Sequence, residues 1–125
     1  FYDFIEPDNE RYVKTVKAIK EHLYHEGLMY RYKAEDDFGV PTSSFTICTF
    51  WLIEALFKIG ETEEAREIFE KMISYSNHLG LYSEDLDFKT KRQLGNFPQA
   101  YSPLAFINTA VLFSEEKHLS KFIRP

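Results

Sequence analysis

An acidic cluster beside aromatic residues is the part of this sequence whose residue types could carry out chemistry. Ser83, Glu84, Asp85 and Asp87 follow Tyr82 within a segment that shows no sustained apolar periodicity. A carboxylate held on an ordered loop beside aromatic rings can serve as a general base. A solvated acidic loop has the same composition, and the spacing alone favours that simpler interpretation because no partner acid stands nearby.

A second candidate is Arg31, which stands between Tyr30 and Tyr32. An arginine fork in this position could bind the hydroxyl groups of a sugar. It could equally stack on the neighbouring rings at the surface. Composition does not separate the two interpretations.

Metal, cofactor and covalent chemistry find little support in the sequence. His22 and His25 stand three residues apart on a predicted helix, but Glu21 and Glu26 lie off their face, so we expect no metal site. Cys48 lies in the most apolar segment and is expected to be a core residue rather than a nucleophile. No triad pattern and no glycine-rich phosphate loop is present, and no cofactor is expected.

The overall composition predicts a folded chain without a nucleic-acid or membrane partner. The 125 residues are 44% hydrophobic and 17% aromatic, which suits one domain or a piece of a larger one. The net charge is -5 and the basic residues are scattered singly, unlike the stripe that phosphate backbones require. The longest apolar run, around Phe50 to Ile53, is too short to span a bilayer. The single cysteine favours a cytoplasmic location. The first residue, Phe1, is not a start methionine, so we expect either a trimmed amino terminus or a longer parent protein.

Apolar spacing predicts an all-α chain of four main helices and a short fifth, and no segment shows the convincing alternation of a strand. The short connection at residues 60–62 makes its two helices antiparallel neighbours, and the long loops 28–42 and 77–96 should meet at the opposite end. The second helix is apolar nearly all round, so something outside the chain should help to cover it. We expect the first helix to begin at Pro7–Asn9 and end at Gly27, and the second to begin at Ser43 or Ser44 and end at Gly60. The third helix should have Thr62 as its N-cap, and the fourth should have Pro98 in its first turn. The short last helix should begin at Ser114.

Ordered motifs resemble a known family. They are residues 27–32 (GLMYRY), 45–51 (FTICTFW), 79–85 (LGLYSED) and 94–102 (LGNFPQAYS). Their order and spacing resemble the carboxyl-terminal part of glycoside hydrolase family fifteen, closest to its prokaryotic glucoamylase and trehalase-like branch. The resemblance implies that residues 1–125 are the last four to five helices of an (α/α)6 toroid, without a separate second domain.

The resemblance also implies roles for individual residues. Glu84 would be the general base of an inverting α-glucosidase, and Arg31, Tyr32 and Phe45 would contact the sugar, while Trp51 is expected in the core. The general acid would come from an upstream segment, so the isolated chain should be inactive without the missing half or another copy. Maltooligosaccharides and trehalose are both possible substrates.

Two positions depart from the family pattern. Leu86 replaces an aromatic residue after the base and is expected to alter the pocket wall, and Pro103 replaces a histidine and removes an amide donor. These departures leave open an alternative function, a non-catalytic helical interaction module that keeps the fold.

Overall fold

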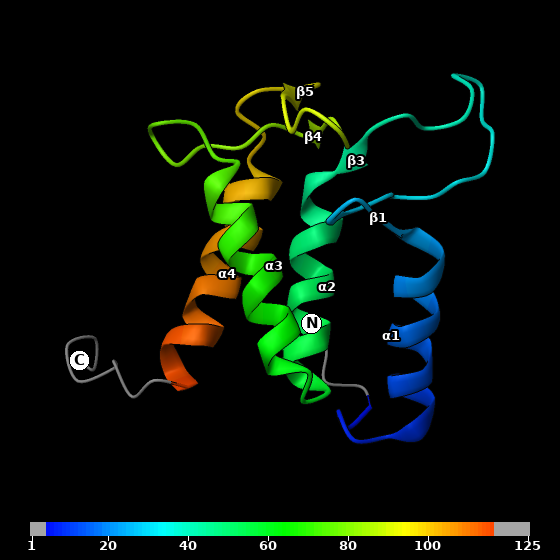
Figure 1. Cartoon of the computed structure of the whole chain (residues 1–125), viewed down its shortest axis with the longest axis vertical. Coiled ribbons are helices and arrows are strands. Elements are labelled where there is room, and N and C mark those ends of the chain that lie inside the picture. Colours follow the sequence, from blue (N-terminus) through cyan, green and yellow to red (C-terminus); the bar gives the residue numbers. More distant parts are fainter. Residues whose placement is uncertain (1–4, 117–125) are drawn as a thin grey trace.

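Four helices form the body of the chain in a computed structural model that describes residues 5–116. The second helix lies between the first on one side and the third and fourth on the other (Figure 1). No helix within residues 5–116 has the length and apolar character needed to cross a membrane. The prediction of an all-α body is confirmed, and the arrangement fits part of a toroid. The helices are α1 (Glu10–Leu23), α2 (Thr46–Lys58), α3 (Thr62–Ser74) and α4 (Tyr101–Glu116).

α1 begins as the sequence predicts but ends earlier. Asn9 is the N-cap, and its side chain accepts a hydrogen bond of 3.0 Å from the Arg11 amide. The helix stops at Leu23, four residues before Gly27, because the chain turns into a hairpin of β1 (Tyr24–His25) and β2 (Leu28–Met29). Gly27 lies in the hairpin turn with φ at 86°, a conformation that suits glycine.

The start of α2 is later than expected and its end is as expected. The helix begins at Thr46 because Ser44 and Phe45 are extended. At its end Gly60 has φ at 87° and its amide donates to the Phe57 carbonyl at 3.1 Å, while the next amide donates to Leu56. These two hydrogen bonds form a Schellman motif, the helix end that a glycine in this position predicts. α3 then starts directly, with Glu61 rather than Thr62 at the N-cap position.

Two small sheets form within the connections, although no segment of the sequence shows convincing alternation. Besides the β1–β2 hairpin, the antiparallel order β3-β4-β5 joins β3 (Ser44–Phe45), β4 (Asp85–Leu86) and β5 (Gln93–Leu94). Each strand has two residues, too few for an alternating pattern in the sequence. Loops 28–42 and 77–96 meet at the same end of the helices, as predicted (Figure 1).

α4 begins and ends differently from the prediction. It starts at Tyr101 rather than Pro98, and it runs through Ser114 to Glu116 without a new start. The predicted short helix beyond residue 116 lies outside the described residues. Pro103 occupies the first turn, where an amide has no partner within the helix, so the missing donor costs little.

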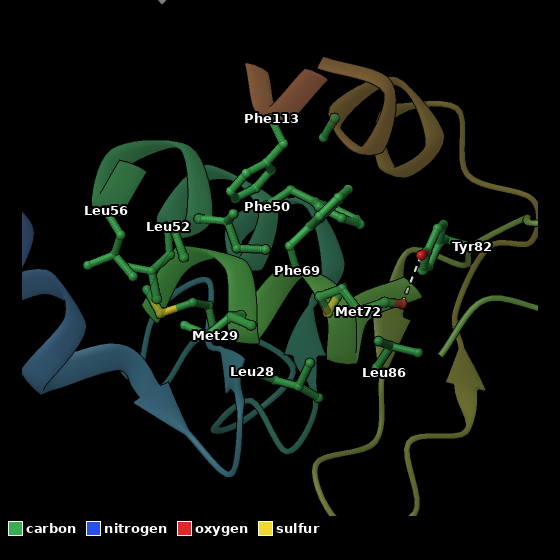
Figure 2. Close-up of a cluster of buried hydrophobic side chains, with 14 of the residues drawn as sticks. Leu28, Met29, Phe50, Leu52, Leu56, Phe69, Met72, Tyr82, Leu86 and Phe113 are labelled. Atoms are coloured by element: carbon green, nitrogen blue, oxygen red, sulfur yellow. Dashed lines mark hydrogen bonds between the residues drawn. The ribbon is translucent and has the colours of Figure 1, made fainter. Parts of the chain in front are cut away.

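α2 supplies the centre of the hydrophobic core. Phe50 is completely buried and contacts the rings of Tyr82 and Phe106 edge to face, at centroid distances of 5.4 and 6.0 Å. Trp51 is 42% exposed and borders two hollows beside α1, so the expectation that it packs in the core was wrong. Core members drawn in Figure 2 include Leu28, Met29, Leu52, Leu56, Phe69, Met72, Leu86 and Phe113.

Replacing Tyr82 with Phe tests whether loop 77–96 is fastened to α3 by a buried hydrogen bond. The Tyr82 hydroxyl donates to the Met72 carbonyl at 2.8 Å inside the core (Figure 2). We expect Tyr82→Phe to lower the free energy of unfolding by about 1 kcal/mol, measured by urea denaturation. Tyr101→Phe is the control because this tyrosine is 61% exposed. Equal effects of the two changes would contradict the assignment.

Candidate active site

A pocket of about 520 Å³ opens where the two long loops meet. We call it the loop-end pocket. All four residues that the sequence analysis selected border it, although Glu84 lies far along the chain from the other three. The structure therefore brings the sequence-predicted site residues together. The lining residues are Arg31, Tyr32, Phe38, Pro41, Ser43, Ser44, Phe45, Glu84 and Asp85.

Pairing of β3 with β4 joins the two halves of this pocket. Phe45 lies opposite Asp85 in the antiparallel register. The Thr46 amide at the start of α2 donates to the Glu84 carbonyl at 2.9 Å, and the buried Ser44 hydroxyl donates to the Leu86 carbonyl at 2.9 Å. The acidic segment is thus bound to the first turn of the central helix.

Asn96 holds Glu84 in place. Its side-chain amide donates to Glu84 Oε2 at 2.9 Å and its backbone amide to the same oxygen at 3.2 Å. In return the Glu84 amide donates to the Asn96 carbonyl at 2.9 Å. Glu84 Oε1 accepts no hydrogen bond from residues 5–116, so this half-buried carboxylate has one anchored oxygen and one available to a water or ligand.

Asp85 is the other carboxylate of the pocket. The Ser43 hydroxyl donates to its Oδ2 at 2.7 Å. Burial raises the pKa of Asp85, and the charge of Glu84 acts in the same direction against the hydrogen bond from Ser43. Sequence reasoning did not select Ser43 or Asn96. Asn96 lies within the motif of residues 94–102, whereas nothing in the sequence distinguishes Ser43 from its neighbour.

Arg31 lies among aromatic rings. Its guanidinium carbon is 5.2 Å from the ring centroid of Phe45 and 5.8 Å from that of Tyr32. Within the described part of the chain it forms no ion pair, so its donors remain available in the pocket. The Tyr32 hydroxyl in turn donates to Asp36, which raises the pKa of Tyr32 and lowers that of Asp36. The guanidinium of Arg31 therefore stacks on aromatic rings, which was the second interpretation of the sequence. Its N–H donors can still bind the hydroxyl groups of a sugar.

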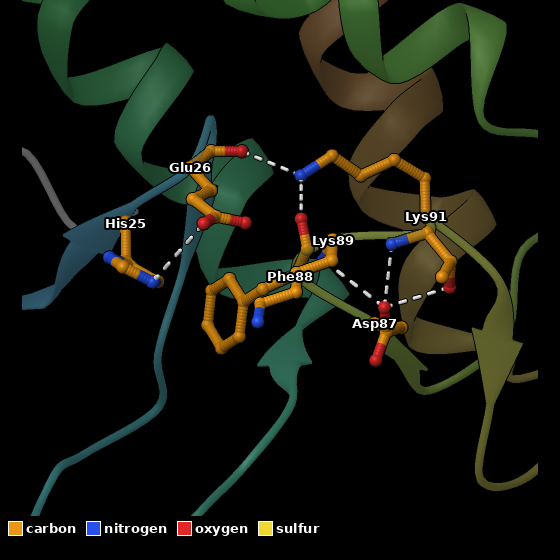
Figure 3. Close-up of polar contacts among 7 residues, drawn as sticks. His25, Glu26, Asp87, Phe88, Lys89 and Lys91 are labelled. Atoms are coloured by element: carbon orange, nitrogen blue, oxygen red, sulfur yellow. Dashed lines mark hydrogen bonds and ion pairs between the residues drawn. The ribbon is translucent and has the colours of Figure 1, made fainter.

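Asp87, the third carboxylate of the acidic cluster, and the nearby Lys91 have structural roles. Asp87 Oδ1 accepts from the Thr90 amide at 2.6 Å and the Lys89 amide at 3.1 Å, and these bonds lower the pKa of Asp87. Lys91 Nζ donates to the carbonyls of Phe88 and Glu26, the latter at 2.7 Å (Figure 3). Lys91 thereby ties the acidic loop to the β1–β2 hairpin. Glu84 and Asp85 are therefore the carboxylates of the pocket, whereas Asp87 forms hydrogen bonds within its own loop.

Two further expectations concern the pocket wall and the thiol. Leu86 is completely buried in the core and is not among the residues that border the loop-end pocket. β4 alternates its side chains, and Leu86 therefore points to the opposite side from Asp85. Burial raises the pKa of Cys48 to about 11, which disfavours the nucleophilic thiolate.

Other polar surfaces of residues 5–116 offer less. No group of three His, Cys, Asp or Glu in this range is placed to hold a metal ion. A second hollow of about 440 Å³ between α1 and α3 is lined by charges that already pair with each other. Lys17 lies 3.6 Å from Glu61, and Lys20 lies 2.5 Å from Glu64. The loop-end pocket is the better candidate because its charged groups are not consumed by such pairs.

Comparison with known proteins finds one matching family and several similar trehalases. The family model for glycosyl hydrolases family 15 matches residues 1–111. A trehalase of Mycolicibacterium smegmatis is 42% identical over 111 residues, which cover 86% of this chain and 17% of that protein. A trehalase of Thermoplasma acidophilum is 41% identical over 121 residues, 94% of this chain and 21% of that protein. Trehalase 1 of Sulfolobus acidocaldarius is 34% identical over 100 residues, 80% of this chain and 18% of that protein. The chain thus spans about a fifth of the length of these relatives. No solved structure matches it.

Gly95 should be needed for the position of the Glu84 carboxylate. It has φ at 72°, and a Cβ added there would lie 3.0 Å from Glu84 Oε2 and 3.3 Å from Glu84 Cβ. We expect Gly95→Ala to displace the carboxylate from Asn96 and to speed hydrogen exchange of the Asn96 amide.

Gly80→Ala provides the matched control for this change. Gly80 has nearly the same φ, 75°, but an added Cβ would meet nothing within 4 Å. Both variants carry the backbone strain, about 1 to 2 kcal/mol, and only Gly95→Ala carries the contact. Equal exchange rates of the Asn96 amide in the two variants would show that the contact does not position Glu84.

Proposed function

Since this chain belongs to glycosyl hydrolases family 15, we propose that it forms the general-base side of an active site that hydrolyses terminal α-linked glucose with inversion. The observation that carries the proposal is one pocket containing Glu84, Arg31, Tyr32 and Phe45. A carboxylate, a guanidinium with available donors and two aromatic rings are suited to bind a sugar and a water molecule together.

In this proposal Glu84 activates the attacking water. Asn96 binds Oε2 through two donors and orients the carboxylate, so Oε1 remains to accept a proton from water. Inverting enzymes place this water between the base and the face of the sugar ring opposite the leaving group. A base that is fixed before the substrate arrives needs little reorganisation in the transition state.

Arg31 and the two aromatic rings bind the terminal glucose. The ring faces of Phe45 and Tyr32 hold the guanidinium in the pocket, at 5.2 and 5.8 Å from their centroids. Its planar donors suit neighbouring hydroxyl groups, and the rings provide apolar area for C–H groups of the sugar.

The general acid comes from outside this chain in the proposed site. In inverting enzymes the two carboxyl groups stand about 6.5 to 9.5 Å apart and flank the bond that is broken. Asp85 is the only other carboxylate that borders the pocket among residues 5–116, and it follows Glu84 directly on the same strand. The acid would therefore be supplied by the part of the relatives' length that this chain does not span, or by another copy of the chain.

Trehalose is the proposed substrate, with maltooligosaccharides as the alternative glucosides. The three relatives compared above are trehalases. Their similarity covers 80 to 94% of this chain. We infer trehalose from this similarity, because the contacts proposed for the terminal glucose do not identify the second sugar.

A non-catalytic helical module is the second candidate function. It is favoured by one observation, that the described pocket holds a candidate base without a separately placed acid. Such a module would keep the helices and the pocket while the reaction is lost. Replacement of the base and an assay of the isolated chain separate the two candidates.

The Glu84→Gln change tests the assignment of the base in the native polypeptide that carries this chain. We expect kcat for trehalose to fall by about 10² to 10⁴-fold, because water activation is removed, while KM changes little. Glucose release gives both constants. Asp85→Asn is the control and should have a milder effect. Parental rates with Glu84→Gln and loss of activity with Asp85→Asn would place the base one residue later.

The isolated 125-residue chain should release no glucose from trehalose or maltooligosaccharides. Inversion needs an acid and a base on opposite sides of the anomeric carbon, and residues 5–116 place only the candidate base in the pocket. Glucose would be assayed over a long incubation, with molecular mass measured by light scattering. Release that Glu84→Gln abolishes would show that the acid lies within this chain or its oligomer.

A further inference from the structure

Phe38 is an aromatic side chain at the rim of the loop-end pocket that the proposed reaction does not use. It is 98% exposed, yet it borders the same pocket as Glu84 and Arg31. A large apolar side chain in this setting forgoes the free energy of burial. An exposed aromatic ring beside a pocket is a feature of surfaces that bind a ligand or partner.

Hydrogen bonds close the turn that carries Phe38 and connect it to Tyr32. The Phe38 amide donates to Asp36 Oδ1 at 2.8 Å, and Asp36 and Gly39 exchange backbone hydrogen bonds of 2.9 and 3.3 Å. The Tyr32 hydroxyl also donates to Asp36. Tyr32 lines the pocket itself, so the turn that presents Phe38 is attached to the pocket wall.

The pocket runs from half-buried groups to this exposed ring. Glu84, Asp85 and Phe45 are partly buried where the strands meet, whereas Phe38 is exposed. The loop 28–42, to which Phe38 belongs, projects from the helices in Figure 1. A disaccharide cleaved beside Glu84 would place one sugar against the buried groups. Its second sugar would extend toward the rim.

We propose that Phe38 is a stacking platform for the second sugar ring of a disaccharide substrate. The inference rests on the proposed function. Phenylalanine has no hydroxyl group, so it offers only an apolar face, which suits the C–H face of a sugar and tolerates different hydroxyl arrangements. Phe38 therefore favours substrates with a second ring, while Arg31 and Phe45 bind the first.

Two substrates that differ in the second ring test the proposal in the native polypeptide. Trehalose has a second sugar, and α-glucosyl fluoride has a fluoride leaving group instead. We expect Phe38→Ala to lower kcat/KM for trehalose roughly ten-fold, the scale of one aromatic contact, and to leave kcat/KM for α-glucosyl fluoride within about two-fold. Phe38→Trp should restore most of the trehalose value.

Val40→Ala is the matched control. Val40 lies on the same loop, is 57% exposed and does not border the pocket, so neither substrate should respond. If Phe38→Ala lowered kcat/KM equally for both substrates, or changed it for neither, the proposed stacking role of Phe38 would be wrong. A fall in Tm confined to Phe38→Ala would also overturn it, because Phe38 would then pack against the rest of the polypeptide.

The proposed function is tested separately in the same series. Glu84→Gln should lower kcat for both substrates by about 10² to 10⁴-fold, and turnover at the parental rate would contradict the function without reference to Phe38. Calorimetric titration of trehalose and glucose into the Glu84→Gln protein measures the second-ring preference without turnover. Phe38→Ala in that background should weaken trehalose binding and leave glucose binding unchanged; equal weakening of both would reject the platform.

Discussion

The pairing of β3 with β4 is the interaction on which the rest of the structure depends. It places Phe45 opposite Asp85 and lets the Thr46 amide donate to the Glu84 carbonyl. The amides at the start of a helix have no partner within it, and here one of them holds the acidic loop. A short strand pair thereby unites residues from distant parts of the chain into one pocket at the end of the central helix.

The loop from residue 77 to residue 96 is ordered because buried groups at its base use its polar atoms. The Gln93 side chain donates to the carbonyls of Leu81 and Tyr75 at 3.1 and 3.3 Å, and the Tyr82 hydroxyl reaches α3. Lys91 attaches the outer part of the loop to the β1–β2 hairpin (Figure 3). A carboxylate on such a loop is positioned by hydrogen bonds that can be assigned one by one, which is what a general base requires.

The exposed apolar surface and the composition of the pocket both agree with further chain beside these helices. α4 leaves an apolar stripe exposed, and Trp51 on α2 is also exposed. Stripes of this kind in folded proteins are commonly covered by another surface. Among residues 5–116, the loop-end pocket likewise contains the candidate base Glu84 and no separately placed candidate acid. Both features agree with the proposal that further chain completes the domain, as does the span of about a fifth of the trehalase relatives. The stripe consists of Tyr101, Leu104, Ile107 and Val111.

The sequence by itself determined the helices and the candidate residues. Apolar spacing and local signals such as Asn9 and Gly60 identified helices whose formation depends on near neighbours, and motif resemblance selected Glu84 and Arg31. Only the tertiary structure decided the two-residue strands, the early end of α1 and the hydrogen bonds of Asn96 and Ser43 to the carboxylates. These features arise from contacts between residues far apart in the chain, and such contacts leave no period in the sequence. The position of a carboxylate in a pocket is therefore a property of packing, whereas the presence of the helix beneath it is a property of the local sequence.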